Sequence, residues 1–187
     1  MDLIRSIEEY APFNAQEIAD KALILAALAA QPGVFSRENL HVHMTASAWI
    51  VNRRRDRALM AYHNIYRSWS WLGGHADGER DLLQVALREA REESGLASVR
   101  AVSEDIFSLE ALTVDGHEKR GKYVPSHTHL NLTYLVEADD SEPLFAKADE
   151  NSDVRWFSLD EAVSASCEPW MRDRIYTKLN QKLREGR

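Results

Sequence analysis

The chain has few of the residues that would tie it to an oxidising compartment or to a membrane. It contains one cysteine among 187 residues, Cys167, so no disulfide can form within the chain. Its longest apolar run covers residues 22–30, whereas a helix needs about 20 apolar residues to cross a bilayer. The run follows Glu8, Glu9, Glu17 and Asp20 rather than the basic region that starts a signal peptide. A reducing cytoplasm is therefore the expected location.

Positive charge is also in short supply. The chain has 23 Lys and Arg against 30 Asp and Glu, which gives a formal net charge of −7. A general nucleic-acid or anionic-membrane surface needs a basic face, so neither class of partner is expected. A small phosphate-bearing substrate stays compatible with this charge, because a few local cations are enough to bind it.

The order of the expected elements favours an α/β (α+β) fold with a mixed β-sheet between helices. Residues 2–31 are expected to form two helices. Strands are expected over 41–51 and 57–63, within 99–112, and over 127–136 and 154–157. Residues 113–125 are expected to be a polar insertion with turn residues at both ends. The remaining expected helices lie over 81–95, after Ser158, and over 168–184.

The most informative stretch, residues 73–96, joins a glycine-containing loop to a helix rich in carboxylates. Asp81 is well placed to cap that helix. At about 100° per residue, Glu89, Glu92 and Glu93 share one arc of the helical wheel. Like charges four residues apart destabilise a helix by a few tenths of a kcal/mol, so a bound hard cation would account for the cluster. The alternative is an ordinary solvated helix face.

This stretch resembles the Nudix box. The run Arg88-Glu89-Ala90-Arg91-Glu92-Glu93-Ser94-Gly95-Leu96 is similar to the family's Arg-Glu-apolar-x-Glu-Glu-x-Gly-apolar, and Gly73-Gly74-His75 is similar to the start of the box. Arg80 stands where the family has a glutamate, and an arginine cannot bind a cation. Either Glu79 or Asp77 substitutes through a shifted loop, or the site is weaker or differently tuned.

The resemblance implies an α/β/α sandwich and metal-dependent hydrolysis of a diphosphate linkage in a small molecule, commonly a nucleoside diphosphate linked to another moiety. It implies that Gly74, Glu89, Glu92 and Glu93 bind Mg²⁺ or Mn²⁺. In several members of the family one of these glutamates also orients or deprotonates the attacking water, and in others the base lies on a loop outside the box. We expect Glu93 or Glu89 to be the base here, and the resemblance implies that Arg88 braces the glutamates. The alternative from another functional class is a Nudix-fold ligand-binding or regulatory module without turnover.

We expect residues 1–187 to form a single Nudix-like domain. Its parts would be a helical N-terminal cap over 1–35, a catalytic core over 40–165 and a C-terminal helix over 168–184. The Ala- and Leu-rich face of the cap needs cover, which its own domain or a second copy in a homodimer could supply.

Two His-x-His pairs lie outside the box, His41 with His43 and His127 with His129. Alternate residues of a strand face the same side, so each pair could point two imidazoles at a ligand or metal, and together they could form a second site. The alternative is that they are hydrogen-bonded residues at strand ends. Arg120 is either a phosphate contact or part of a solvated loop tip. The candidate substrate-binding residues are His127, His129 and Arg120.

Overall fold

Two long central strands, β1 (Val42–Asn52) and β9 (His127–Ala138), organise the molecule. The computed structural model describes residues 2–119 and 121–186, and in it these strands pair in parallel along their whole length. Because side chains alternate along a strand, the two strands present an apolar set to one face and a mixed set to the other. The apolar set is Met44, Ala46, Ala48, Ile50, Leu130, Leu132, Tyr134, Val136 and Ala138.

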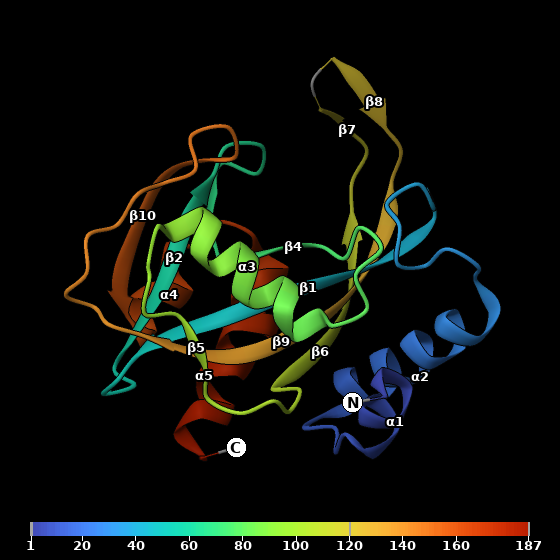
Figure 1. Ribbon diagram of the computed structural model, residues 1–187, viewed down its shortest axis with the longest axis horizontal. Helices are drawn as coiled ribbons and strands as arrows, with labels where there is room; N and C mark the ends of the chain where they lie inside the picture. The colour runs from blue at the N-terminus through green and yellow to red at the C-terminus, as the bar shows by residue number, and fades with distance from the viewer. Residues whose placement is uncertain (1, 120, 187) are drawn as a thin grey trace.

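The other strands extend this pair into an eight-stranded mixed sheet (Figure 1). The sheet order is β10-β2-β1-β9-β5, while β3, β4 and β6 pair with β2, β1 and β9. All pairs except β1 with β9 are antiparallel. Their bounds are β2 (Arg57–His63), β3 (Ser68–Ser70), β4 (Leu72–His75), β5 (Arg100–Ala101), β6 (Ser108–Val114) and β10 (Asn151–Ser158).

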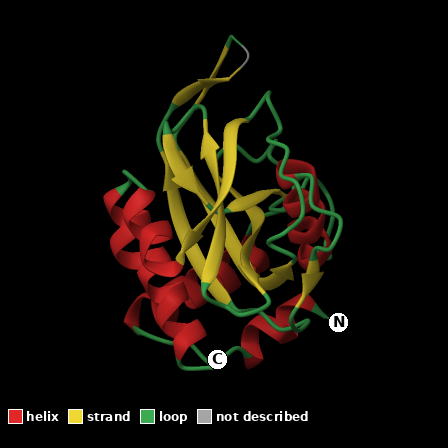
Figure 2. Cartoon of the chain, turned by 90° about the vertical axis from the view of Figure 1, so that its left-hand side faces the viewer, coloured by secondary structure: helices red, strands yellow, loops and turns green. Residues whose placement is uncertain are grey.

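Helices cover both faces of the sheet, as Figure 2 shows from the side. On one face, α3 (Leu82–Ser94) packs with the apolar set of β1 and β9. On the other face, α4 (Leu159–Ala165), the π-helical segment η1 (Met171–Tyr176) and α5 (Thr177–Arg184) enclose a second core around Trp49. The predicted mixed sheet between helices is confirmed. Among the described residues, no helix combines the length and apolarity that crossing a membrane requires.

Two segments differ in detail from their predicted form. The polar insertion over 113–125 contains a hairpin of β7 (His117–Lys119) and β8 (Lys122–Val124), which projects from the sheet as an arm (Figure 1). Gly121 at its turn has φ 73°, a left-handed conformation that glycine adopts freely. The C-terminal helix is present but begins as a π-helix, where the Thr177 hydroxyl donates to the Arg172 carbonyl at 2.8 Å.

The N-terminal helices α1 (Leu3–Glu9) and α2 (Ala15–Ala30) pack on their own domain through a buried charged network. Lys178 of α5 lies 3.1 Å from Glu17 of α2 and 2.9 Å from Glu110 of β6. Lys182 adds a contact of 3.2 Å to Glu17. Burial raises the pKa of Glu17, but Lys178 and the hydrogen bond from Tyr10 outweigh it and leave the pKa below its usual value. The network fixes the helices in place because charges buried this deeply need their partners.

Candidate active site

The helix predicted over residues 81–95 is present, whereas residues 73–75, predicted to lie in a loop, form the end of strand β4 because they pair with β1. Asp81 caps α3 by accepting a hydrogen bond of 3.1 Å from the Gln84 amide. Gly95 ends the helix in a left-handed conformation with φ 73°. Ahead of the helix, β4 pairs with β1 so that Gly73 lies opposite Ser47. A side chain on Gly73 would lie 2.5 Å from the Ala46 carbonyl oxygen, so only glycine fits there.

Glu93, near the end of α3, is a buried carboxylate. Its side chain accepts a hydrogen bond of 3.0 Å from the Gly73 amide at Oε2 and another of 3.0 Å from the Asn151 side-chain amide at Oε1. Burial raises the pKa of Glu93 to about 7, with smaller contributions from the Glu89 and Glu150 carboxylates, although the two hydrogen bonds act in the opposite direction. A nearby positive charge would therefore stabilise the ionised form of this carboxylate.

Glu89 lies one turn before Glu93 and touches the glycine pair. A Cβ added to Gly74 would lie 2.6 Å from the Glu89 Cδ, so the absence of a side chain at Gly74 makes room for this carboxylate. Arg88 donates to Glu89 Oε1 at 2.9 Å, which matches the bracing role that the resemblance implies. Gly74, Arg88, Glu89 and Glu93 all line one cavity.

Glu92 is placed differently from the other two glutamates. Its side chain is 47% exposed, lies 3.6 Å from the Lys147 ammonium and 4.0 Å from Arg88, and does not line that cavity. Sharing an arc on the helical wheel therefore did not give the three glutamates the same surroundings. Its role as a metal ligand stays a prediction.

Arg80 lies outside the cavity, with its guanidinium 4.7 Å from the centre of the Phe35 ring. Glu79 does not point into the cavity either, since its carboxylate accepts the backbone amides of Arg80 and Asp81. Asp77 does line the cavity, where Arg37 Nε donates to it at 2.6 Å. Of the two acidic residues that could substitute for the missing glutamate, Asp77 lines the cavity and Glu79 does not.

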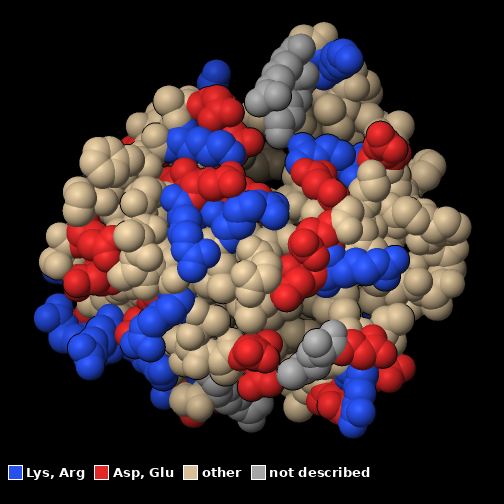
Figure 3. All heavy atoms as spheres, viewed as in Figure 1, with Lys and Arg blue, Asp and Glu red and all other residues tan. Residues whose placement is uncertain are grey.

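The cavity has a volume of about 810 Å³ and combines three kinds of lining. The first kind consists of glutamates and cationic side chains, with Arg37, Arg88 and Lys147 as the cations. The second consists of aromatic and apolar side chains, among them Leu40, Ile65, Tyr66, Trp71, Met171 and Tyr176. Figure 3 shows interleaved acidic and basic side chains on this face and a recess between α3 and the β7–β8 arm.

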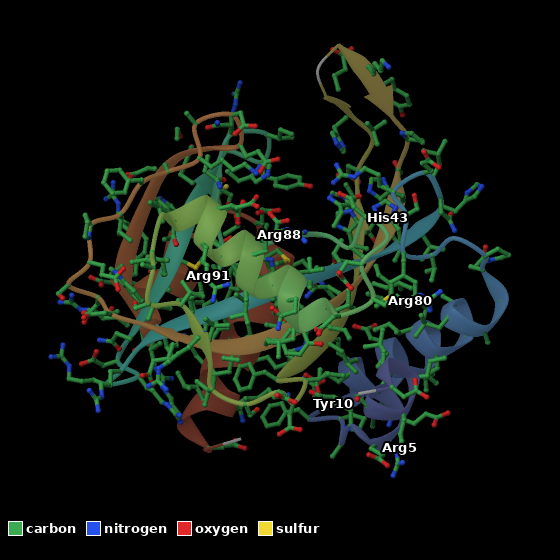
Figure 4. All side chains as sticks on the ribbon, in the orientation of Figure 1. Arg5, Tyr10, His43, Arg80, Arg88 and Arg91 are labelled. Atoms are coloured by element: carbon green, nitrogen blue, oxygen red, sulfur yellow. The ribbon has the colours of Figure 1, made fainter. Side chains whose placement is uncertain are left out.

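Histidines form the third kind of lining: six line the cavity, and four of them form a cluster (Figure 4, where His43 is labelled at the foot of the arm). The strand register explains their meeting, because His43 pairs with His129 and Thr45 pairs with His75. The ring centroids of His43, His75 and His129 lie 4.9–5.1 Å apart. His127 joins the cluster with its Nε2 3.0 Å from that of His129. Burial, together with the neighbouring imidazoles, lowers the pKa of His129 to about 2.

The two His-x-His pairs thus divide unequally. His127 and His129 both enter the cluster, whereas only His43 of the first pair does, since His41 is exposed ahead of β1. His43 and His127 also contact backbone carbonyl oxygens, of Asn39 and Pro125. The hydrogen-bonded interpretation thus applies to His43 and His127, while binding of a ligand or metal by the cluster stays a prediction. Arg120 lies outside the described residues.

Several residues that line the cavity or support its glutamates carry no signal in the sequence. Lys147, Glu150 and Asn151 lie between two predicted strands, and only the folded chain brings them to α3. Asn131 is the buried link from the cavity to the charged network, because it accepts from Thr45 and Ser47 and donates to Glu110. Alternation along β9 places Asn131 on the histidine face, but nothing in the sequence reveals its partners.

Comparison with known proteins gives one family and one fold. The family model for the NUDIX domain matches residues 41–179. A search of curated protein sequences finds no match. Among solved structures, a NUDIX-family hydrolase from Clostridium perfringens aligns with a TM-score of 0.55 at 20% identity, covering 78% of this chain and 98% of that one. An Ap4A hydrolase binary complex from C. elegans aligns with a TM-score of 0.52 at 20% identity, covering 76% and 96%.

The matched span contains the whole box and the strands that support it, and the fold is that of both neighbours. The chain belongs to the Nudix family, and it is a hydrolase that acts on pyrophosphate bonds.

Proposed function

We propose that the protein uses Mg²⁺, or Mn²⁺ in its place, to hydrolyse a diphosphate linkage that joins a nucleoside diphosphate to another moiety. One observation carries the proposal: the Glu89 and Glu93 side chains meet the glycine pair on the wall of a cavity that also presents cations. The charged groups are of the kind that phosphate chemistry needs.

The donor set suits a hard divalent cation. Glu89, Glu93 and the Gly74 carbonyl offer oxygen atoms, which Mg²⁺ prefers over nitrogen or sulfur. The raised pKa of Glu93 supports the same assignment. Glu93 is buried near the Glu89 and Glu150 carboxylates, so a bound cation would stabilise its ionised form. Glu92, which does not line the cavity, would have to turn toward it to be the fourth proposed ligand. When bound, the cation would offset negative charge on the phosphate oxygens.

The protein side chains then have separate roles. Glu93 or Glu89 takes a proton from the water whose oxygen attacks phosphorus, as the bridging P–O bond breaks. Arg88 holds Glu89 in place and, with Arg37 and Lys147, offers positive charge to the phosphates. The apolar and aromatic lining, with Tyr66 and Trp71, suits the base or the leaving moiety of the substrate.

The proposal also covers surroundings and partners. A single exposed cysteine and a net charge of −7 support a cytoplasmic enzyme of small molecules without a general nucleic-acid surface. A homodimer is compatible with the exposed side chains of α2, such as Ile18. The division into cap, core and C-terminal helix within one domain is proposed on the same basis.

A phosphate-release screen tests the proposed reaction. Nucleoside triphosphates, sugar nucleotides, ADP-ribose and dinucleoside polyphosphates are each incubated with the enzyme, with and without Mg²⁺. We expect turnover of at least one diphosphate-linked nucleotide, only with the cation present. Glu93→Gln and Glu89→Gln should each lower kcat by a factor of about 100 or more, since a positioned base alone contributes about 100-fold or more. Glu104→Gln, which alters an exposed carboxylate away from the cavity, is the matched control.

Two results would overturn the proposal. An unchanged rate in both glutamine variants would remove the site assignment. Metal-dependent binding of a nucleotide without turnover of any substrate would instead favour a ligand-binding module built on this fold.

A further inference from the structure

We propose that His43, His75 and His129 form a second metal site in the same cavity, specific for a borderline divalent ion such as Zn²⁺. It is separate from the carboxylate site, because its donors are nitrogen atoms from three different strands. One ligand atom from each of the three residues lies within 4.8 Å of the others.

The spacing suits a bound ion after small side-chain rotations. Zinc–nitrogen bonds of about 2.0–2.1 Å place two ligands of a tetrahedral ion about 3.3 Å apart. The three imidazoles project from paired strands, since His43 of β1 is in register with His129 of β9 and β4 brings His75 alongside. The backbone is thus already in place, and only the rings have to move.

Hydrogen bonds to backbone carbonyls set the ring tautomers. The Nδ1 of His43 lies 3.0 Å from the Asn39 carbonyl oxygen, which can only accept, so Nδ1 carries the proton. The Nε2 of His43 is then a bare lone pair. This atom is buried and finds no hydrogen-bond partner among the residues that the structure describes. A buried acceptor without a donor is what an ion-binding imidazole leaves when the ion is absent.

The same argument applies to His129 through its neighbour. The Nδ1 of His127 donates to the Pro125 carbonyl at 2.8 Å, so its Nε2 is an acceptor. That Nε2 lies 3.0 Å from the Nε2 of His129, which therefore donates and leaves its own Nδ1 as the lone pair. His127 is thus a positioning residue that orients His129, as outer-shell partners orient zinc-bound histidines.

The donor set selects the metal. Imidazole nitrogen suits Zn²⁺ and its transition-metal neighbours, whereas Mg²⁺ prefers oxygen. Three protein ligands leave one tetrahedral position, and all three residues line the cavity. That position therefore faces the substrate space and takes water or an anionic substrate oxygen. The enzyme would then hold a hard cation on its carboxylates and a borderline cation on its histidines.

Metal titration of the untagged full-length protein tests the proposal. After removal of bound metal, Zn²⁺ affinity and stoichiometry are measured by chelator competition with Mg²⁺ in excess, and Co²⁺ is added as a spectroscopic probe. We expect one Zn²⁺ per chain and visible Co²⁺ bands of four- or five-coordinate intensity.

Variants identify the ligands. His75→Gln and His129→Gln should each weaken Zn²⁺ binding by a factor of about 100 or more, since loss of an outer-shell partner alone costs about 10–100-fold. His41→Gln, the exposed histidine of the first pair, and Glu89→Gln should leave it unchanged. Two results would overturn the proposal: failure to bind one Zn²⁺ per chain when Mg²⁺ is in excess, or loss of Zn²⁺ binding in Glu89→Gln but not in the histidine variants. Neither result would bear on the assignment of the protein as a hydrolase.

The wild-type protein supplies an independent readout if the histidine variants fold poorly. In imidazole ¹H–¹⁵N spectra, Zn²⁺ should shift the signals of His43, His75 and His129 and spare those of His41. Equal shifts for the cluster and for His41, or no shift in the cluster, would contradict the assignment.

Discussion

The side-chain amide of Asn151 donates a hydrogen bond of 3.0 Å to Glu93, a residue 58 positions away in the sequence. It connects the first residue of β10 to the last turn of α3, and both partners are buried. The contact holds one oxygen of the carboxylate, while the Gly73 amide holds the other. The position of Glu93 thus depends on three separate segments of the chain.

Asn151→Ala should therefore damage both stability and activity. Loss of a partner to a buried acceptor costs about 1–3 kcal/mol, and a misplaced Glu93 should lower kcat/KM by roughly tenfold or more. Urea unfolding and a Mg²⁺ titration of kcat/KM measure the two effects. Asn180→Ala is the control, because Asn180 donates to the Leu159 carbonyl away from the cavity. It should lose stability and keep kcat/KM, and equal kcat/KM in the two variants would contradict the role of Asn151.

Gly74→Ala should leave the protein folded but strongly reduce its activity. The added Cβ meets the far end of the Glu89 side chain, at 2.6 Å from Cδ, and that side chain can swing away. We expect a small change in Tm and a loss of kcat/KM of about 100-fold, because a ligand moved by about 1 Å no longer fits the reacting geometry. Thermal unfolding and Mg²⁺-dependent kinetics check this. Retention of activity would show that Glu89 acts from a different position.

Arg80→Ala should have little effect on catalysis, although Arg80 replaces the usual glutamate of the box. Its guanidinium packs over Phe35 and does not line the cavity. An exposed cation–π contact contributes about 0.5–1 kcal/mol, so a small loss of stability is expected. The kcat/KM should change by less than about threefold. A change of more than tenfold in the Mg²⁺ requirement would place Arg80 in the metal site after all.

Glu17→Gln should strongly lower the free energy of unfolding and should change how that free energy depends on pH in the acidic range. The folded state holds the pKa of Glu17 below its usual value of 4.5, despite burial, through Lys178 and the Tyr10 hydrogen bond. The ionised Glu17 side chain therefore stabilises the folded state at pH values above the pKa that it has in the unfolded chain. This stabilisation is lost as the pH falls through its lower pKa in the folded state. Removing the charge at neutral pH leaves two buried lysines less compensated, at a cost of about 3–5 kcal/mol.

Urea unfolding between pH 3 and 7 checks this effect, with Glu9→Gln as the matched control. Glu9 pairs with Arg5 on the surface, where both side chains are more than half exposed. Such pairs contribute at most about 1 kcal/mol, so this control should behave like the wild type. Equal effects of the two substitutions would show that the buried network adds nothing specific.

Local chemistry predicted much of the fold, and pairing across the chain decided the rest. The helix from Asp81 to Gly95 depends on residues within itself, so its caps were predictable. The strand His127–Ala138 likewise reveals itself by alternation. The arm was missed because its two strands are only three residues long and carry no apolar alternation.

The site was predictable where its residues are close in sequence. Gly74, Glu89 and Glu93 come together through one loop and one helix, so their spacing within the box was enough to predict that they lie close together. The burial of Glu93 was not evident, because it depends on Asn151 and on the sheet behind α3. The histidine cluster needed the strand register, which places His43 beside His129 and which no local pattern encodes.

The parallel pairing of β1 with β9 also has a consequence for how the enzyme is made. Its partners, such as His43 and His129, are separated by most of the catalytic core in sequence. Contacts of such long range close late and slow folding, because the entropy of a large loop must be lost before they form. The histidine cluster and the hydrogen bonds from Thr45 and Ser47 to Asn131 join β1 to β9, so they can form only when these two strands pair. In refolding experiments, enzyme activity should therefore return late and in a single step, after the β1–β2 hairpin and α3 have formed.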